Sequence, residues 1–418
     1  MNMSSLQKSL LKSKLPPLGI PPPSSSAMSI AKSGRRAGIG RKRDYTPIHW
    51  SQYFTRSEDV VINEERDTFH VYLRGHSGPL LLLLHGGGFS ALTWALFSVC
   101  IDSLVECQVM AIDLRGHGDS KTQKEEDLSA ETCASDVINV VKAVFGEDAP
   151  PIVLVGHSMG GAIAVHTAAA DQLPTLAGLI VIDVVEGTAM EALTSMQSFL
   201  RSRPRQFTSL ETAVEWSVRS GQIRNAESAR VSVPGQLSNI LTGKCATSEV
   251  SESAPCTPQS ASISLPNTPN SPPPVHGECI EEEEEEPGDA AFKSPSSATS
   301  PSKSLSSYQW RIDLTRTEKH WPGWFHGLSS RFLSIPTAKL LLLAGIDRLD
   351  KELTVGQMQG KFQMQVLPQC GHAVHEDVPD KVAEVVATFL TRNRLTTPKD
   401  KFGCIGFYEE EKSWKNHT

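Results

Sequence analysis

Short runs of consecutive apolar residues recur along the chain, separated by segments with helical periodicity. Several runs are continuously apolar rather than alternating, which is typical of strands covered by helices on both faces. Strands that alternate with helices predict a mostly parallel sheet flanked by helices. The expected strands are residues 68–73, 79–84, 108–112, 152–155, 179–182, 339–344 and 362–367, and the expected helices are 129–144, 159–170 and 381–392.

An insertion interrupts this alternation. Its later part, residues 244–307, is rich in Ser, Pro and Thr, includes the glutamate run 281–286, and has too few large apolar residues to offset chain entropy. We therefore expect that part to be disordered. The predicted regions are a disordered basic Ser/Pro-rich tail (1–43), the first part of the core (44–184), a lid insertion (185–332), the second part of the core (333–394) and a C-terminal tail (395–418).

The composition favours a globular protein with a large core over a nucleic-acid-binding or membrane-spanning protein. Of the 418 residues 39% are hydrophobic, enough for a large core, and the formal net charge of -7 leaves no basic excess for general nucleic-acid binding. The apolar runs fall short of the roughly 20 residues that a membrane-spanning helix needs. The 8 cysteines lack regular spacing, which favours a reducing compartment. The basic clusters within residues 35–43 indicate either a nuclear import signal or a solvated tail.

The strongest chemical signal is a G-x-S-x-G motif at residues 156–160, between an expected strand and an expected helix. This context is the one in which the motif forms a nucleophile elbow, a sharp turn that exposes a serine at the sheet edge. We therefore predict Ser158 as a nucleophile. The alternative is a glycine-rich turn whose serine only caps the helix.

A second motif, His-Gly-Gly-Gly at residues 85–88, also follows an expected strand. Glycine-rich loops of this type place backbone N–H groups against a substrate carbonyl. The predicted oxyanion donors are the N–H of Met159 together with that of Gly87 or Gly88. The two motifs together predict an α/β-hydrolase fold. A loop at residues 113–120, D-x-R-G-x-G-x-S, is interpreted as structural, with Arg115 joining neighbouring loops.

The general base is expected on the loop after the last strand, where His372 follows a glycine. His375 is the competitor, whereas His157 is expected to point away from Ser158 and His85 to support its own loop. Two acids fit the order Ser, Asp, His along the chain. Position favours Asp347, after the expected strand 339–344, and Asp183 at the end of strand 179–182 also fits. The histidines lack the spacing of a metal site, and no cofactor is expected.

Several segments resemble the protein phosphatase methylesterases. The resemblance extends from about Arg41 to Arg394 and fails in the acidic insertion and the C-terminal tail. It implies a triad of Ser158, Asp183 and His372, so it favours Asp183 over Asp347. The segments that carry it are residues 41–45, 50–54, 156–166, 182–190, 356–363 and 369–377.

The resemblance also implies a substrate, the methyl ester on the C-terminal leucine of the catalytic subunit of type 2A protein phosphatase, and direct docking onto that partner. A cytoplasmic and nuclear location is expected. Because methanol is a small leaving group, selectivity must come from the acyl side of the ester. Trp310, Trp321, Trp324 and Phe325 form either that recognition surface or simply lid core. The alternatives are a phosphatase-binding inhibitor with incidental esterase activity and a general small-molecule esterase.

Overall fold

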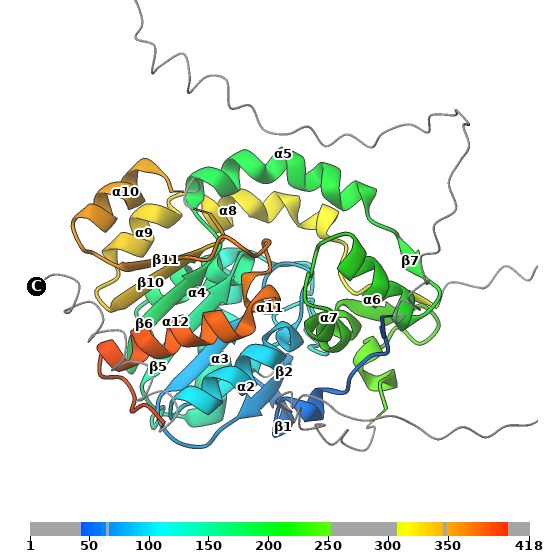
Figure 1. Cartoon of the computed structure of the whole chain (residues 1–418), viewed down its shortest axis with the longest axis horizontal. Helices are drawn as coiled ribbons and strands as arrows, with labels where there is room; N and C mark the ends of the chain where they lie inside the picture. Colours follow the sequence, from blue (N-terminus) through cyan, green and yellow to red (C-terminus); the bar gives the residue numbers. More distant parts are fainter. Residues whose placement is uncertain (1–42, 64–66, 252–306, 346–348, 400–418) are drawn as a thin grey trace, which may run out of the picture. The chain divides into compact units, whose positions relative to one another are not determined.

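A mostly parallel eight-stranded sheet is the centre of the protein, in a computed structural model that describes residues 43–63, 67–251, 307–345 and 349–399. The strand order is β1-β2-β4-β3-β5-β6-β10-β11, and β2 runs antiparallel to both of its neighbours. Figure 1 shows the sheet between its flanking helices. The strands are β1 (Arg56–Val61), β2 (Thr68–Arg74), β3 (Leu80–Leu84), β4 (Gln108–Ile112), β5 (Ile152–His157), β6 (Leu176–Ile182), β10 (Ala338–Leu343) and β11 (Gln363–Val366).

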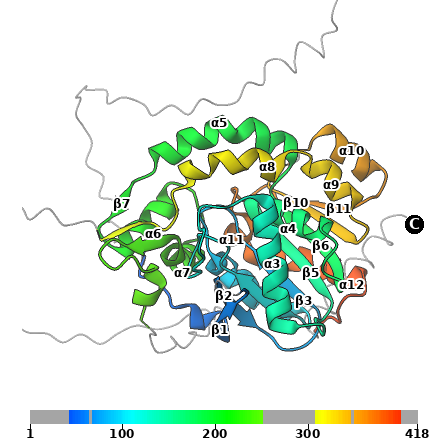
Figure 2. The same cartoon turned by 180° about the vertical axis from the view of Figure 1, so that it is seen from behind.

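Helices cover both faces of this sheet, as Figures 1 and 2 show from opposite sides. The five leucines of β3 explain the continuous apolar pattern, because Leu80, Leu82 and Leu84 pack into one core while Leu81 and Leu83 pack into the other. All five are buried. One face is covered by α3 (Ala130–Phe145) and α4 (Met159–Ala169), and the other by α2 (Ala95–Leu104) and α12 (Pro379–Arg392).

The insertion lies between β6 and β10 in the chain and forms a third, smaller apolar core. Its strands make a separate antiparallel sheet in the order β7-β9-β8. None of the described helices is long and apolar enough to cross a membrane. The elements of the insertion are α5 (Glu186–Ser202), β7 (Gln206–Phe207), α6 (Leu210–Arg219), α7 (Ala226–Ser232), η3 (Val233–Gln236), β8 (Leu237–Asn239), η4 (Ala246–Glu249), β9 (Tyr308–Trp310), η5 (Leu314–His320), α8 (Trp321–Phe325) and α9 (Leu328–Ser334).

The seven predicted strands and three predicted helices are all present, with small shifts of their ends. Sequence patterns missed β1 because it is an edge strand, in which only Val60 is buried. They also missed α2 and the short elements around the sheet edge. These are η1 (Trp50–Gln52), η2 (Ala91–Trp94), α10 (Lys351–Met358) and α11 (Val374–Asp377).

The predicted boundaries of disorder need one correction. Most of the range 244–307 lies outside the described residues, as do residues 1–42 and 400–418. Residues 244–251, however, are folded, because Cys245 forms an antiparallel bridge with Ser238, and both Cys245 and Ala246 are buried. The first residues of the predicted tail are also tied to the core, since Pro398 forms a bridge with Val105.

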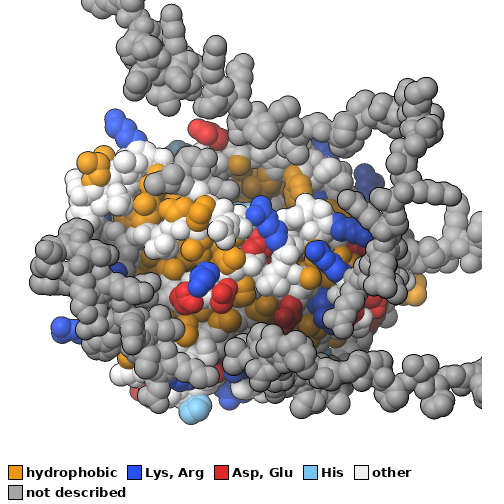
Figure 3. Space-filling model, in the orientation of Figure 1, with side chains coloured by type: hydrophobic (Ala, Val, Ile, Leu, Met, Phe, Trp, Pro, Cys, Tyr) orange, Lys and Arg blue, Asp and Glu red, His pale blue; other side chains and the backbone are white. Residues whose placement is uncertain are grey.

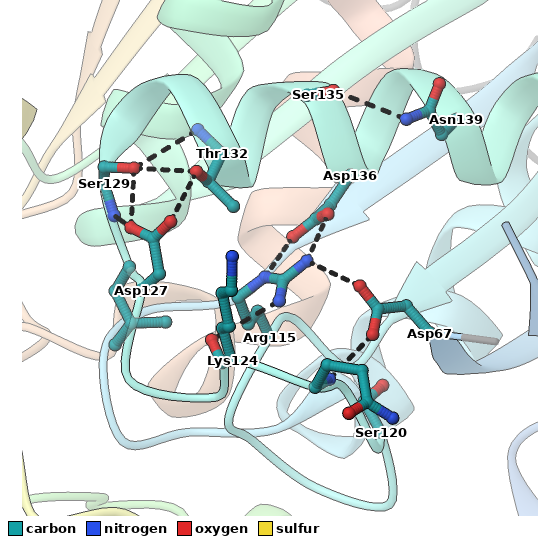
Figure 4. Close-up of polar contacts among 12 residues, drawn as sticks. Asp67, Arg115, Ser120, Lys124, Asp127, Ser129, Thr132, Ser135, Asp136 and Asn139 are labelled. Atoms are coloured by element: carbon teal, nitrogen blue, oxygen red, sulfur yellow. Dashed lines mark hydrogen bonds and ion pairs between the residues drawn. The ribbon is translucent and has the colours of Figure 1, made fainter. Parts of the chain in front are cut away.

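Arg115 lies in the loop that follows β4 and joins this loop to two other segments of the chain (Figure 4). The sequence predicted this structural role. Its guanidinium donates two hydrogen bonds of 2.7 Å to Asp136 on α3 and one of 3.2 Å to Asp67. Gly118 is needed in this loop, because a Cβ at that position would lie 2.1 Å from the carboxylate of Asp113. The same view shows Ser129 capping α3 through the N–H of Thr132.

Candidate active site

Ser158 occupies a tight turn between β5 and α4, where its φ of 52° and ψ of −121° are unfavourable for a residue with a side chain. The turn is held by a 3.0 Å hydrogen bond from its N–H to the carbonyl of Ile182. The flanking glycines are sterically required. A Cβ at Gly156 would lie 2.2 Å from the carbonyl oxygen of Gly160, and one at Gly160 would lie 2.4 Å from that of Leu84.

A continuous hydrogen-bonded chain runs from this serine to a buried carboxylate. The hydroxyl of Ser158 donates to Nε2 of His372 at 3.0 Å, and Nδ1 of His372 donates to Asp183 at 2.8 Å. The second oxygen of Asp183 accepts the N–H of Ala344 at 2.9 Å. The carboxylate is fully buried while the imidazole is 52% exposed. The structure thus brings Ser158, Asp183 and His372 together, whereas Asp347 lies outside the described residues.

The other candidate histidines have structural contacts instead. His375 is buried, is hydrogen-bonded to Thr93 at 2.8 Å and packs on Trp94. His157 points away from the nucleophile and donates at 2.8 Å to the carbonyl of His372. Burial lowers the pKa of His375 to about 3 and that of His157 well below its usual value. Both rings are therefore uncharged near neutral pH. The hydrogen bond from His157 joins the nucleophile turn to the histidine loop.

Two neighbouring carboxylates hold the histidine loop against the insertion. Glu376 is fully buried and accepts hydrogen bonds from Thr93 on η2 and from two serines of α7, at 2.5 to 2.7 Å. Burial raises the pKa of Glu376 to about 7. Asp377 accepts the N–H groups of Gly371 and Arg224, both at 2.7 Å. Sequence reasoning did not predict the role of Glu376, because a carboxylate that accepts hydroxyls from distant parts of the chain leaves no local motif. The serines of α7 are Ser228 and Ser232.

In the glycine loop after β3, the two candidate oxyanion glycines differ in the hydrogen bonding of their N–H groups. The N–H of Gly88 already donates to Nε2 of His117 at 2.9 Å. No hydrogen bond among the described residues is recorded for the N–H of Gly87, which lies beside Met159 at the wall of the catalytic cavity. His85 supports this loop, since its Nδ1 donates to Gly86 and its Nε2 accepts the N–H of Leu114.

A cavity of about 320 Å³ opens beside Ser158 and His372, and its lining is mainly apolar. The insertion supplies most of that lining, so the sheet provides the reactive groups and the insertion encloses them. Trp321, Trp324 and Phe325 are buried in the same core as α3 and α4 and also line the cavity, which makes them both core residues and cavity wall. The other lining residues of the insertion are Met196, Phe199, Leu200, Arg203, Ser220, Gly221, Gln222, Leu314 and Thr317.

No cluster of His, Cys, Asp or Glu suited to hold a metal ion occurs among the described residues. On the face in Figure 3, acidic and basic side chains are intermingled with exposed hydrophobic ones.

Comparison with known proteins first defines the class. Residues 81–385 match the model of the alpha/beta hydrolase family, so this chain is an α/β hydrolase. Among solved structures, E-2-(acetamidomethylene)succinate hydrolase is 16% identical with a TM-score of 0.56, covering 80% of this chain and 99% of that one. An M. tuberculosis esterase is 18% identical with a TM-score of 0.51, covering 80% and 92%. Likeness at this level shows the shared fold alone.

Curated relatives then define the family. The chain is 56% identical to protein phosphatase methylesterase 1 of Mus musculus and 55% identical to that of Homo sapiens, in each case over 96% of this chain and 99% of the relative. A probable protein phosphatase methylesterase 1 of Caenorhabditis elegans is 44% identical over 86% of this chain and 81% of the relative. The chain therefore belongs to the protein phosphatase methylesterase family, which confirms the resemblance seen in its sequence.

Proposed function

We propose that this protein is a serine carboxylesterase that removes the methyl ester from the C-terminal leucine of the catalytic subunit of type 2A protein phosphatase. The observation that carries the proposal is the hydrogen-bonded chain from Ser158 through His372 to Asp183, which opens onto a largely apolar cavity. The names of the relatives support a phosphatase as the substrate. The type 2A subunit and its leucine ester are the more specific part of the proposal.

The mechanism is acyl transfer in two steps. His372 takes the proton of Ser158 as the serine oxygen attacks the ester carbonyl, and Asp183 stabilises the resulting imidazolium. When the tetrahedral intermediate collapses, the C–O bond to the methoxy group breaks and the proton leaves with methanol. Water then attacks the acyl-serine with His372 as base, and the free C-terminal carboxylate is released.

The negative charge on the carbonyl oxygen is stabilised by the N–H groups of Met159 and Gly87 in this proposal. Met159 is the first residue of α4, so its N–H is one of the first N–H groups of the helix, which have no partner within the helix. Gly87 is preferred to Gly88 because the N–H of Gly88 is already bound to His117. Loss of one such donor typically slows catalysis by about 10² to 10³.

Methanol release from purified carboxymethylated phosphatase tests the proposal. The wild-type protein is expected to release methanol and leave a free C-terminal carboxylate, whereas Ser158→Ala retains at most a small residual rate. A wild-type protein that hydrolyses small esters but leaves the methylated phosphatase intact would contradict it. The inhibitor alternative is not favoured, because the assembled triad has no role in a protein that only binds.

We also propose that the protein is located in the cytoplasm and the nucleus. A cytoplasmic and nuclear protein would fit the basic clusters within residues 35–43, which lie almost entirely outside the described part of the chain. Replacing these basic residues with Gln is expected to reduce the nuclear fraction of the full-length protein in cells. An unchanged distribution would show that the clusters are only a solvated tail.

A further inference from the structure

Arg203 is an unusual residue in the wall of an otherwise largely apolar catalytic cavity. It follows the last residue of α5 and lines the same cavity as Ser158 and His372. It also lines a neighbouring groove of about 750 Å³, which shares Leu200 and Leu314 with the catalytic cavity. The two hollows therefore adjoin at Arg203, which can contact a substrate chain that lies in either of them.

The guanidinium of Arg203 is held in place by an aromatic platform. Its central carbon lies 3.6 Å from the centre of the Trp310 ring, within the range of a cation–π contact. Trp310 is itself fixed, because its Nε1 donates at 2.7 Å to the carbonyl of Pro204 and its ring contacts Phe207 and Trp216. The cation is thus positioned before any ligand binds, which lowers the entropic cost of binding one.

The hydrogen-bonding capacity of Arg203 is unused within the described part of the chain. No hydrogen bond or ion pair with another described residue is recorded for its five N–H donors, although burial lowers its pKa only to about 10 and leaves it charged. The nearest acid that influences it is Asp313, whose carboxylate instead caps η5 through the N–H and hydroxyl of Thr315. The guanidinium therefore keeps donors that can form charge-assisted hydrogen bonds with an anionic group entering the cavity.

The charges of the groove indicate where such an anion would lie. Arg201, Arg203 and Arg205 line one side, and the acidic residues Asp313 and Glu318 come from the η5 segment. Of the three arginines, Arg203 is the one that also lines the catalytic cavity within the described residues. An anionic group on the substrate is thus favoured against the 201–205 segment and disfavoured against η5.

We propose that Arg203 is a specificity-determining residue that binds an anionic side chain, a carboxylate or a phosphate, located upstream of the methyl ester in the acyl chain of the substrate. This inference rests on the proposed function, since it requires a peptide whose C-terminus lies at Ser158. A bidentate hydrogen bond from the planar guanidinium to the anion supplies the selectivity that the small methyl group cannot supply.

The test uses the full-length protein and synthetic peptide methyl esters that differ at one upstream position, carrying Asp, Asn or phosphoserine there. Each position within reach of the groove is varied in turn, and kcat/KM is measured by methanol release. At one position the wild-type protein is expected to prefer Asp over Asn by about tenfold, the size of a charge-assisted hydrogen bond. The phosphoserine peptide shows whether carboxylate or phosphate is the better ligand.

Arg203→Gln is expected to reduce the preference for Asp over Asn to near one, and Arg203→Lys to retain part of it. Arg203→Glu should reverse the charge preference, so that a peptide with Lys at that position is hydrolysed faster than the one with Asp. A misfolded variant cannot show such a reversal. Arg219→Gln, an exposed arginine on α6 paired with Glu215, is the control and should keep the full preference.

Two results would overturn the proposal. Wild-type protein that hydrolyses all peptides without regard to charge removes the role of Arg203 but leaves the esterase function intact. If Arg203→Gln lowered kcat/KM equally for the Asp and Asn peptides, the residue would act only through the fold. Failure of the wild-type protein to hydrolyse any peptide ester or the methylated phosphatase itself would remove the proposed function and this inference together.

Discussion

The central sheet and the insertion contribute to the same cavity in different ways. The sheet presents Ser158, Asp183 and His372 on turns at the carboxyl ends of parallel strands, where buried leucine and valine runs fix the backbone on both faces. The insertion builds its share from the long helix α5, the short helices η5 and α8, and the loop after α6, and it contributes mostly apolar wall. The difference indicates that the geometry of the fold fixes the chemistry, whereas the insertion selects the substrate.

The largest effect on activity is expected from replacing the acid of the triad, which the central sheet positions. Asp183→Asn keeps the shape of the side chain but removes the charge that stabilises protonated His372, so turnover should fall by on the order of 10⁴. Steady-state methanol release measures this loss. Asp347→Asn, which alters the other candidate acid, should stay close to wild type. The reverse ranking of the two variants would show that the acid assignment is wrong.

A methyl group at Gly160 tests how tightly the sheet side is built. Because a Cβ there would lie 2.4 Å from the carbonyl oxygens of Leu84 and His85, Gly160→Ala should destabilise the protein by about 3 kcal/mol and displace the nucleophile turn. Chemical denaturation gives the free energy of unfolding. A variant with wild-type stability and activity would mean that the turn is far more adaptable than the structure indicates.

Glu376 joins the two regions, and its ionisation should couple stability to pH. Its folded-state pKa of about 7 lies above the ordinary value of 4.5, so the folded protein binds the extra proton between these limits. The stabilisation from this group is therefore present below about pH 4.5 and is lost as the pH rises to about 7, in total roughly 3 kcal/mol.

Glu376→Gln removes this titration, so the difference in unfolding free energy between wild type and variant should change across that window and be flat above it. Asp113, another buried carboxyl whose pKa is raised to about 6, is common to both proteins and cancels from the difference. A difference that does not vary with pH would show that Glu376 does not titrate there.

The smallest effect is expected in the insertion. Gly323 lies in α8 and lacks a positive φ, and a Cβ at this position would have no heavy atom within 4 Å. Gly323→Ala should therefore stabilise the protein by about 0.5 to 1 kcal/mol by restricting the unfolded chain. Thermal denaturation at fixed pH measures the shift. Destabilisation by this substitution would indicate that the space around Gly323 is smaller than the structure shows.

The same contrast explains what the sequence could predict. The strands could be predicted because strands covered on both faces are continuously apolar. Ser158 could be predicted because a sharp turn between a strand and a helix requires glycines at fixed spacing, and His372 because it follows a glycine on the loop after the last strand. Position along the chain fitted both acids and favoured Asp347, and the family resemblance favoured Asp183. Nothing in the sequence indicated Glu376 or Arg203, because their partners lie more than a hundred residues away and are brought close only by the fold.

Peptide mapping of the acyl-enzyme tests the central claim most directly. An activated ester of a peptide with a C-terminal leucine acylates the protein faster than water can release the product, and mass spectrometry then locates the acyl group. We expect the acyl mass on the fragment that contains Ser158, and no adduct in Ser158→Ala. An acyl group on a different residue, or complete turnover by Ser158→Ala, would contradict the account.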